Sequence, residues 1–137
     1  MKVLLDTNVL ISGIFFGGPP RAVLDAWAED RFELLVSPSI FDEYIRTCDR
    51  LGSSHQVLEY HSVLATIIGR GRLGPDGSVP GPITADPDDD KFMICARDYG
   101  ALVVSGDRHL LQASGWEEVR VVRPSEFLAH LNDPEVP

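Results

Sequence analysis

Acidic residues stand where the chain leaves or enters a regular element, and these are the residues whose types and spacing suggest chemistry. Asp6 directly follows the apolar residues 3–5, and Asp107 comes three residues after the apolar residues 101–104. Glu43 lies in a segment with helical spacing, and residues 86–90 contain four Asp in five positions. Carboxylate oxygens gathered in one place bind hard cations such as Mg²⁺ or Mn²⁺. Metal-assisted chemistry is therefore the hypothesis to weigh.

Strands that alternate with helices would bring these acids together. Residues 3–5, 32–36, 101–104 and 119–122 are short apolar runs, typical of strands buried on both faces of a parallel sheet. Helices are predicted between and after them, at about 19–30, 38–50, 57–68, 89–99, 108–114 and 124–131. The pattern predicts an α/β fold of three layers, α/β/α, with a central, mainly parallel sheet of four to five strands.

In such a sheet the carboxyl ends of the strands share one edge. Asp6, Asp107 and the acids at the start of the helix near Asp89 should therefore approach one another, and Glu43 could join them from its helix. Several carboxylates within a few ångströms repel unless a cation lies between them. All-oxygen ligands favour Mg²⁺ or Mn²⁺ over Zn²⁺.

Each acid also has an ordinary structural explanation when it is taken alone. Asp6 could simply end its strand and cap the next element, Glu43 could be an exposed helical residue, and acids in a first helical turn are favoured by the helix dipole. Four Asp in five positions exceed what capping needs. The combination, not any single residue, carries the metal hypothesis.

Local sequence signals predict several connections. Thr7 and Asn8 suit a turn after Asp6, and Ser37 is expected to cap a helix that has Pro38 at its first position. Residues 73–87 are rich in Gly and Pro and predict a long loop with a short edge strand at 79–84.

Length and composition indicate one globular domain. The chain has 137 residues, which we divide into a single domain at 1–131 and a tail at 132–137. No apolar run approaches a membrane span, so a cytoplasmic location is expected. Cys48 and Cys95 lie among apolar neighbours and are expected to be buried rather than disulfide-bonded. A net charge of -9 argues against tight nonspecific binding of duplex nucleic acid, but a nuclease that concentrates carboxylates around a metal remains compatible with it.

Four segments together resemble the PIN-domain family. They occur in the family's order, cover nearly the whole chain, and are Leu5-Asp6-Thr7-Asn8-Val9-Leu10, the helical Glu43 after Ser37-Pro38, Asp86-Pro87-Asp88-Asp89-Asp90-Lys91-Phe92, and Ser105-Gly106-Asp107-Arg108-His109-Leu110-Leu111. The resemblance is greatest to the bacterial and archaeal members that act as toxins of toxin–antitoxin pairs, related to the VapC ribonucleases.

The resemblance implies a metal-dependent endoribonuclease with one or two Mg²⁺ or Mn²⁺ ions. It implies that the family's acidic quartet, which is both catalytic and metal-binding, corresponds to Asp6, Glu43, Asp90 and Asp107. Asp90 is chosen among the four neighbouring acids because it directly precedes the apolar face of its helix. A cognate antitoxin and a homodimer or higher homo-oligomer are also implied.

Three further residues would support this site. Asn8 and Ser105 match the family's polar supporting residues, whereas His109 stands where many relatives have another Asp. A histidine there could weaken a second metal position, and it suits a donor that supports the ligands slightly better than a direct ligand.

Competing interpretations differ in what they require of the sequence. A receiver-type signalling domain needs a Lys after its last strand, which neither Lys2 nor Lys91 supplies. A haloacid-dehalogenase-like phosphatase needs an Asp where Asn8 stands. The remaining alternative is a catalytically weak or inactive PIN-like module that binds RNA or protein, and Mg²⁺-dependent cleavage of a mixed RNA pool would separate it from a nuclease.

Overall fold

A parallel sheet of five strands forms the centre of the computed structural model, which describes residues 1–52 and 57–133. The strand order is β3-β2-β1-β4-β5, and all neighbouring strands run parallel. The strands are β1 (Lys2–Leu5), β2 (Glu33–Val36), β3 (Arg72–Leu73), β4 (Leu102–Val104) and β5 (Val121–Val122). The predicted α/β fold is confirmed, and the sheet has the upper of the two strand numbers expected.

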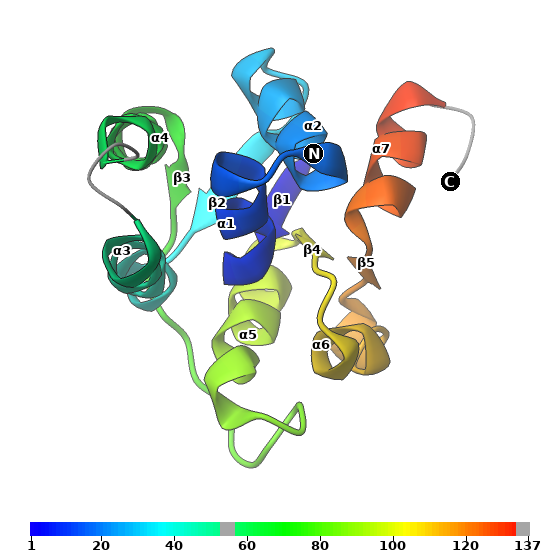
Figure 1. The fold of residues 1–137 in the computed structure, drawn as a ribbon. Coiled ribbons are helices and arrows are strands. Elements are labelled where there is room, and N and C mark those ends of the chain that lie inside the picture. Colours follow the sequence, from blue (N-terminus) through cyan, green and yellow to red (C-terminus); the bar gives the residue numbers. More distant parts are fainter. Residues whose placement is uncertain (53–56, 134–137) are drawn as a thin grey trace.

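Helices connect the strands and pack around the sheet (Figure 1). They are α1 (Thr7–Phe15), α2 (Gly18–Ala28), α3 (Pro38–Leu51), α4 (Val57–Arg70), α5 (Asp90–Tyr99), α6 (Arg108–Gln112) and α7 (Pro124–Asn132), with 3₁₀ turns η1 (Pro87–Asp89) and η2 (Trp116–Glu118). Proline stands in the first turn of α2, α3 and α7, where its missing N–H costs nothing. Gly100 ends α5 with a positive φ of 67°, a conformation that glycine adopts without strain.

The order of the strands defines the edge at which open α/β sheets generally bind ligands. From β1 the chain proceeds to β2 and β3 on one side, and it then returns to β4 and β5 on the other. Right-handed crossovers in opposite directions place α1 to α4 and α5 to α6 on opposite faces of the sheet. The direction changes between β1 and β4, and open α/β sheets bind ligands beyond the carboxyl ends of the strands at such a point.

The core is continuous and apolar around the two central strands. Leu4, Leu5, Val103 and Val104 are fully buried, and burying a side chain of this kind stabilises the fold by about 1.5–3 kcal/mol. Cys48 and Cys95 are buried and free, as expected. The core therefore fixes the ends of β1 and β4 beside each other.

Several local predictions were wrong. Thr7 and Asn8 do not form a turn, because α1 begins directly after Asp6. The edge strand is β3 at Arg72–Leu73, and residues 79–84 form bends instead of a strand. Ser37 precedes α3, but its side chain makes no capping hydrogen bond.

Two other predictions concern residues that the structure describes only in part. The interval between the helices predicted at about 38–50 and 57–68 includes residues 53–56, and the predicted tail at 132–137 includes residues 134–137; both groups lie outside those described. Asn132 still belongs to α7. Across residues 1–52 and 57–133, no helix combines the length and apolarity needed to cross a membrane.

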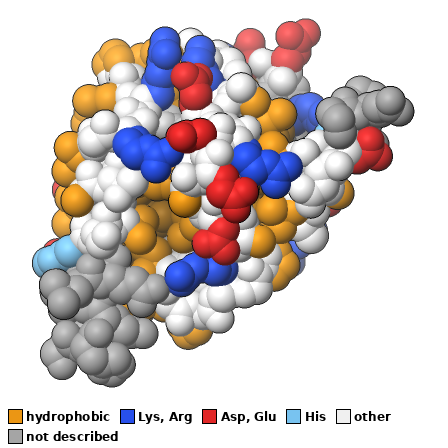
Figure 2. All heavy atoms as spheres, turned by 90° about the horizontal axis from the view of Figure 1, so that it is seen from above, with side chains coloured by type: hydrophobic (Ala, Val, Ile, Leu, Met, Phe, Trp, Pro, Cys, Tyr) orange, Lys and Arg blue, Asp and Glu red, His pale blue; other side chains and the backbone are white. Residues whose placement is uncertain are grey.

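The surface over α2 mixes charges of both signs. Figure 2 looks onto the side that is uppermost in Figure 1, and Lys and Arg side chains stand there among Asp and Glu side chains and apolar patches. Arg21 pairs with Asp25 at 3.7 Å within α2, and Arg70 of α4 pairs with Asp30 just after α2. Asp25 and Asp30 on this surface thus each have a basic partner.

Candidate metal centre

Asp6 and Ser105 lie side by side at the ends of the two central strands. The register pairs Leu5 with Val104, and the Asp6 N–H donates to the Val104 carbonyl at 3.0 Å. The Ser105 hydroxyl donates to Asp6 Oδ2 at 2.7 Å, and both side chains are buried. Ser105 therefore fixes the orientation of the Asp6 carboxylate.

The same serine also positions Asp107. The backbone N–H of Asp107 donates to Ser105 Oγ at 2.9 Å, and Asp107 Oδ2 accepts from the N–H of Leu110 at 3.2 Å at the start of α6. Ser105 thus links the Asp6 carboxylate to the Asp107 backbone and ties the end of β1 to the end of β4. These contacts bring together two acids that are 101 positions apart in the sequence, at 6 and 107.

Glu43 is brought to this edge by α3. The hydroxyl of the fully buried Tyr44 donates to the carbonyl of Leu5 at 2.5 Å, which holds α3 on the end of β1. Burial raises the pKa of Tyr44 well above its ordinary value, so the phenol stays a donor. The neighbouring Glu43 side chain therefore reaches the site from the second turn of a docked helix.

Both oxygens of Glu43 have donors from the protein. The Thr7 hydroxyl donates to Oε2, and the ammonium of Lys91 donates to Oε1 at 2.7 Å. Thr7 comes from the first turn of α1 and Lys91 from that of α5. Glu43 thus lies in the site as one half of an ion pair.

The four Asp of residues 86–90 have different surroundings. Asp86 accepts from the Asp88 N–H at 3.0 Å and begins η1. Asp90 accepts from both the N–H and the hydroxyl of Thr84, at 2.9 and 2.8 Å. Asp90 therefore fastens the preceding loop to the start of α5, and Asp88 is exposed.

Asp89 is the member of this group that joins the other strand end. Its carboxylate, that of Asp107 and a ring nitrogen of His109 each offer a ligand atom, and these atoms lie within 4.8 Å of one another. All three side chains are half-buried. The structure thus brings Asp6, Glu43, Asp107, Ser105 and His109 to one edge as the sequence suggested, but it brings Asp89 there in place of Asp90.

Burial and the close approach of other acids raise the pKa values of Asp89 and Asp6. Burial, together with the hydrogen bond to Asp107 and that residue's charge, raises the pKa of Asp89 to about 7. Burial also raises the pKa of Asp6, with the charges of Asp107 and Glu43 adding to it and the Ser105 hydrogen bond opposing it. Carboxylates in this arrangement resist full ionisation unless a cation neutralises them.

The spacing of these ligand atoms suits a divalent cation. Ligands of Mg²⁺ stand at about 2.1 Å, so two on opposite sides of the ion are about 4.2 Å apart and adjacent ones are closer. The ligand atoms of Asp89, Asp107 and His109 lie within 4.8 Å of one another, which is close to this separation. Two carboxylates and an imidazole fit Mn²⁺ as well as Mg²⁺, because Mn²⁺ accepts nitrogen more readily.

A polar cleft of about 360 Å³ opens beside the acids. Asp6, Glu43 and Asp89 line it together with the basic residues Arg46, Arg50 and Lys91. Asn8 is exposed and also lines it. Sequence reasoning gave Lys91 no role in this site, and the signal that could have drawn attention to it is its place next to the row of Asp.

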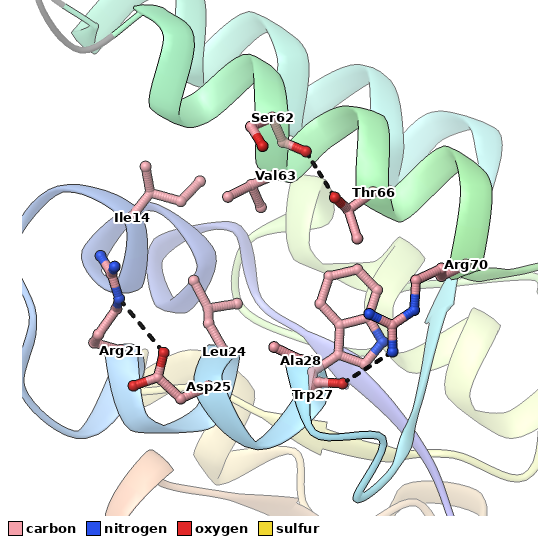
Figure 3. Close-up of a pocket in the computed structure, with 10 residues that line it drawn as sticks. All are labelled: Ile14, Arg21, Leu24, Asp25, Trp27, Ala28, Ser62, Val63, Thr66 and Arg70. Carbon is pink, nitrogen blue, oxygen red and sulfur yellow. Dashed lines mark hydrogen bonds and ion pairs between the residues drawn. The ribbon is translucent and has the colours of Figure 1, made fainter.

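Two other hollows have a different character. One lies between α1, α2 and α4, where Ile14, Leu24 and Val63 meet, and the Arg70 guanidinium stands 5.5 Å from the centre of the Trp27 ring (Figure 3). The other is an apolar hollow between α3, α4 and β3. Neither is lined by a group of carboxylates, in contrast to the cleft at the carboxyl edge of the sheet, which is the candidate site.

Comparison with known proteins gives one family. The chain matches the model of the PIN domain over residues 2–109. It is 28% identical to the uncharacterised protein MJ1680 of Methanocaldococcus jannaschii, in an alignment that covers 93% of this chain and 90% of that protein.

Solved structures share the fold at low sequence identity. PAE2754 from Pyrobaculum aerophilum superposes with a TM-score of 0.65 at 18% identity, covering 96% of this chain and 90% of that one. VapBC2 from Rickettsia felis, bound to a DNA fragment from its promoter, gives 0.59 at 13% identity, covering 88% and 97%. FitAcB from Neisseria gonorrhoeae gives 0.57 at 18% identity, covering 90% and 98%. The family match extends from β1 into the first turn of α6 and includes all the acids described above, and the chain belongs to the PIN-domain family.

Proposed function

We propose that this protein is a metal-dependent endoribonuclease that hydrolyses phosphodiester bonds with Mg²⁺ or Mn²⁺, and that it is the toxin of a toxin–antitoxin pair. The observation that carries the proposal is the meeting of Asp6, Asp89 and Asp107 at the edge where β1 and β4 end. Membership of the PIN-domain family, whose members are generally nucleases, supports the same reaction class.

Asp6, Asp89 and Asp107 are the proposed metal ligands. Asp89 replaces Asp90 in this assignment because the Asp90 carboxylate is occupied by Thr84 in its own loop. His109 lies close enough to complete the group, and we propose that it binds the ion directly instead of supporting the acids from behind.

When bound, the divalent ion would activate water and neutralise charge on the scissile phosphate. The protein's part is to hold its ligands and the water in place. Ser105 orients Asp6 and Asp107, so the ligands need not reorganise during the reaction. Glu43 faces the same cleft and would accept a hydrogen bond from the attacking water.

The substrate would enter through the polar cleft. Arg46 and Arg50 of α3 line this cleft. Guanidinium groups bind phosphate in a planar, two-pronged manner. They would hold backbone phosphates that flank the scissile bond, although Arg46 is also paired with Asp42 at 3.0 Å.

Asn8 is exposed at the rim of the cleft and would contact the same strand of RNA.

An antitoxin protein is the proposed partner. The sequence resembles toxins of the VapC type, and VapBC2 of Rickettsia felis shares the fold. A partner that places basic or apolar side chains in the acidic cleft would block the metal ligands and the path of the RNA. Self-association, implied by the family, is part of the same proposal.

Replacement of Asp6 by asparagine tests the reaction. Asp6→Asn keeps the shape and the Ser105 hydrogen bond but removes the negative charge, so Mg²⁺-dependent cleavage of a mixed RNA pool should be abolished while the far-UV circular dichroism is retained. The matched control is Asp25→Asn, an identical change at an exposed acid of α2, which should cleave like wild type.

Two results would count against the proposal. If Asp6→Asn, purified free of metal, were fully active, the assignment of Asp6 would be wrong. If the wild-type protein failed to cleave RNA with either metal, the inactive binding module would be the better interpretation.

A further inference from the structure

Lys91 is held inside the acidic site by several contacts. Its ammonium donates to Glu43 Oε1 and to the backbone carbonyl of Asp88, both at 2.7 Å. It also stands 5.4 Å from the centre of the ring of Phe92, which is fully buried. The side chains of Lys91 and Glu43 are only 23% and 24% exposed, so water screens this pair less than a surface pair. The ammonium is thus a fixed cation that lines the cleft.

The acids of the site therefore fall into two groups. Glu43 is neutralised by Lys91 and accepts a further hydrogen bond from Thr7. The other group is Asp6, Asp89 and Asp107, whose described partners are one another, hydroxyl groups and backbone N–H groups. The second group needs a cation that the protein does not supply, whereas the first already has one.

We propose that Lys91 takes the place of a second divalent ion beside Glu43, so that the site binds a single ion, the one held by Asp6, Asp89 and Asp107 together with His109. This inference rests on the proposed function and deepens it. In sites with two metals the ions stand about 3.5–4 Å apart and share ligands. A second ion at Glu43 would have to compete with the Lys91 ammonium on Oε1 or with the Thr7 hydroxyl on Oε2. Like-charge repulsion from a tethered ammonium opposes its entry.

The number of bound ions tests this directly. Titration calorimetry of Mn²⁺ into the full-length, chelator-treated protein should give one ion per chain. Lys91→Met keeps the length of the side chain but removes its charge, which leaves Glu43 without a cation, so a second and weaker ion should bind. The double variant Lys91→Met, Glu43→Gln should bind one ion again, because it lacks the carboxylate of Glu43. Lys91→Arg keeps the positive charge and should bind one ion, as the wild type does. Lys91→Gln repeats the test should the methionine variant fail to fold.

The outcomes separate this inference from the proposed function. A wild-type protein that binds no Mn²⁺ would overturn the metal-dependent function and this inference with it. A wild-type protein that binds two ions, or a folded Lys91→Met or Lys91→Gln variant that still binds one with unchanged affinity, would overturn the role of Lys91 alone. Thermal unfolding without metal establishes which variants are folded.

Discussion

Acidic residues have different partners on the surface over α2 and at the carboxyl edge of the sheet. Over α2 and its neighbours, Asp25 and Asp30 each have an arginine partner, and charges of both signs mix (Figure 2). At the carboxyl edge, Asp6, Asp89 and Asp107 approach one another. The first arrangement suits a stable surface, and the second costs stability without a cation. Such local conflict within a well-packed fold is typical of a functional site.

Asp89 and Asp90 repeat this contrast at neighbouring positions. Asp90 closes its own loop through Thr84, as a structural residue does. Asp89 faces another acid, Asp107, and its pKa rises to about 7. If this contrast is correct, substitution of Asp89 should reduce activity, whereas substitution of Asp90 should reduce stability.

The largest expected effect is the loss of activity in Asp89→Asn. Cleavage with Mg²⁺ should fall by more than about 100-fold, because losing even a residue that only supports a metal ligand costs about 10–100-fold. Asp90→Ala should instead cost about 1–3 kcal/mol of unfolding free energy, since it strands the polar groups of the buried Thr84. Steady-state cleavage and urea unfolding measure the two. Loss of activity in Asp90→Ala while Asp89→Asn stays active, at equal folded fraction, would favour the sequence-based choice of Asp90.

The second effect is a pH dependence of stability in the metal-free protein. The folded-state pKa of Asp89 is about 7 and its ordinary value is 3.8, so between these pH values the folded state binds more protons than the unfolded state. The contribution of Asp89 to stability is therefore greatest below pH 4 and is lost as the pH rises toward 7. Asp6, whose pKa is also raised, acts with the same sign.

Asp89→Asn isolates that contribution. In chelator, the melting temperature of Asp89→Asn minus that of wild type should increase from pH 5 to pH 8, and saturating Mg²⁺ should reverse the order at pH 8. Differential scanning fluorimetry at both pH values measures this difference. A difference that does not change with pH would mean that Asp89 is not crowded by Asp107.

The smallest effect is expected where the acids are paired. Asp30→Asn removes the exposed ion pair with Arg70 and should change the unfolding free energy by less than about 1 kcal/mol. Asp30 has a positive φ of 60°, which asparagine tolerates as well as aspartate does, so the backbone adds no penalty. Urea unfolding and RNA cleavage should both resemble wild type. A loss of cleavage in Asp30→Asn would show that the α2 surface takes part in function, and the comparison would fail.

The sequence predicts the sheet and two of its acids because the relevant signals are local. A continuous apolar run followed by an acid is how a buried parallel strand ends, and this pattern located Asp6 and Asp107. The strand β3 has no such signal, because its two residues, Arg72 and Leu73, are both exposed at an edge. No helix was predicted at α1 (Thr7–Phe15), because the polar residues after Asp6 resemble a turn.

The choice among the row of Asp depends on geometry that sequence does not carry. Successive residues of a helix point about 100° apart. Asp89 ends a 3₁₀ turn and Asp90 begins α5, so a shift of one residue decides which carboxylate faces Asp107. The pairing of Lys91 with Glu43 likewise joins residues 48 positions apart. Such contacts follow from the packing of α3 and α5 around the end of β1.

A crystal structure of the wild-type protein grown with Mn²⁺, with anomalous diffraction to locate the ion, tests the central claim most directly. We predict an anomalous peak within coordination distance of the carboxylates of Asp6, Asp89 and Asp107. Full Mn²⁺ occupancy elsewhere with no peak among these three carboxylates, or carboxylates that point away from one another, would contradict the account.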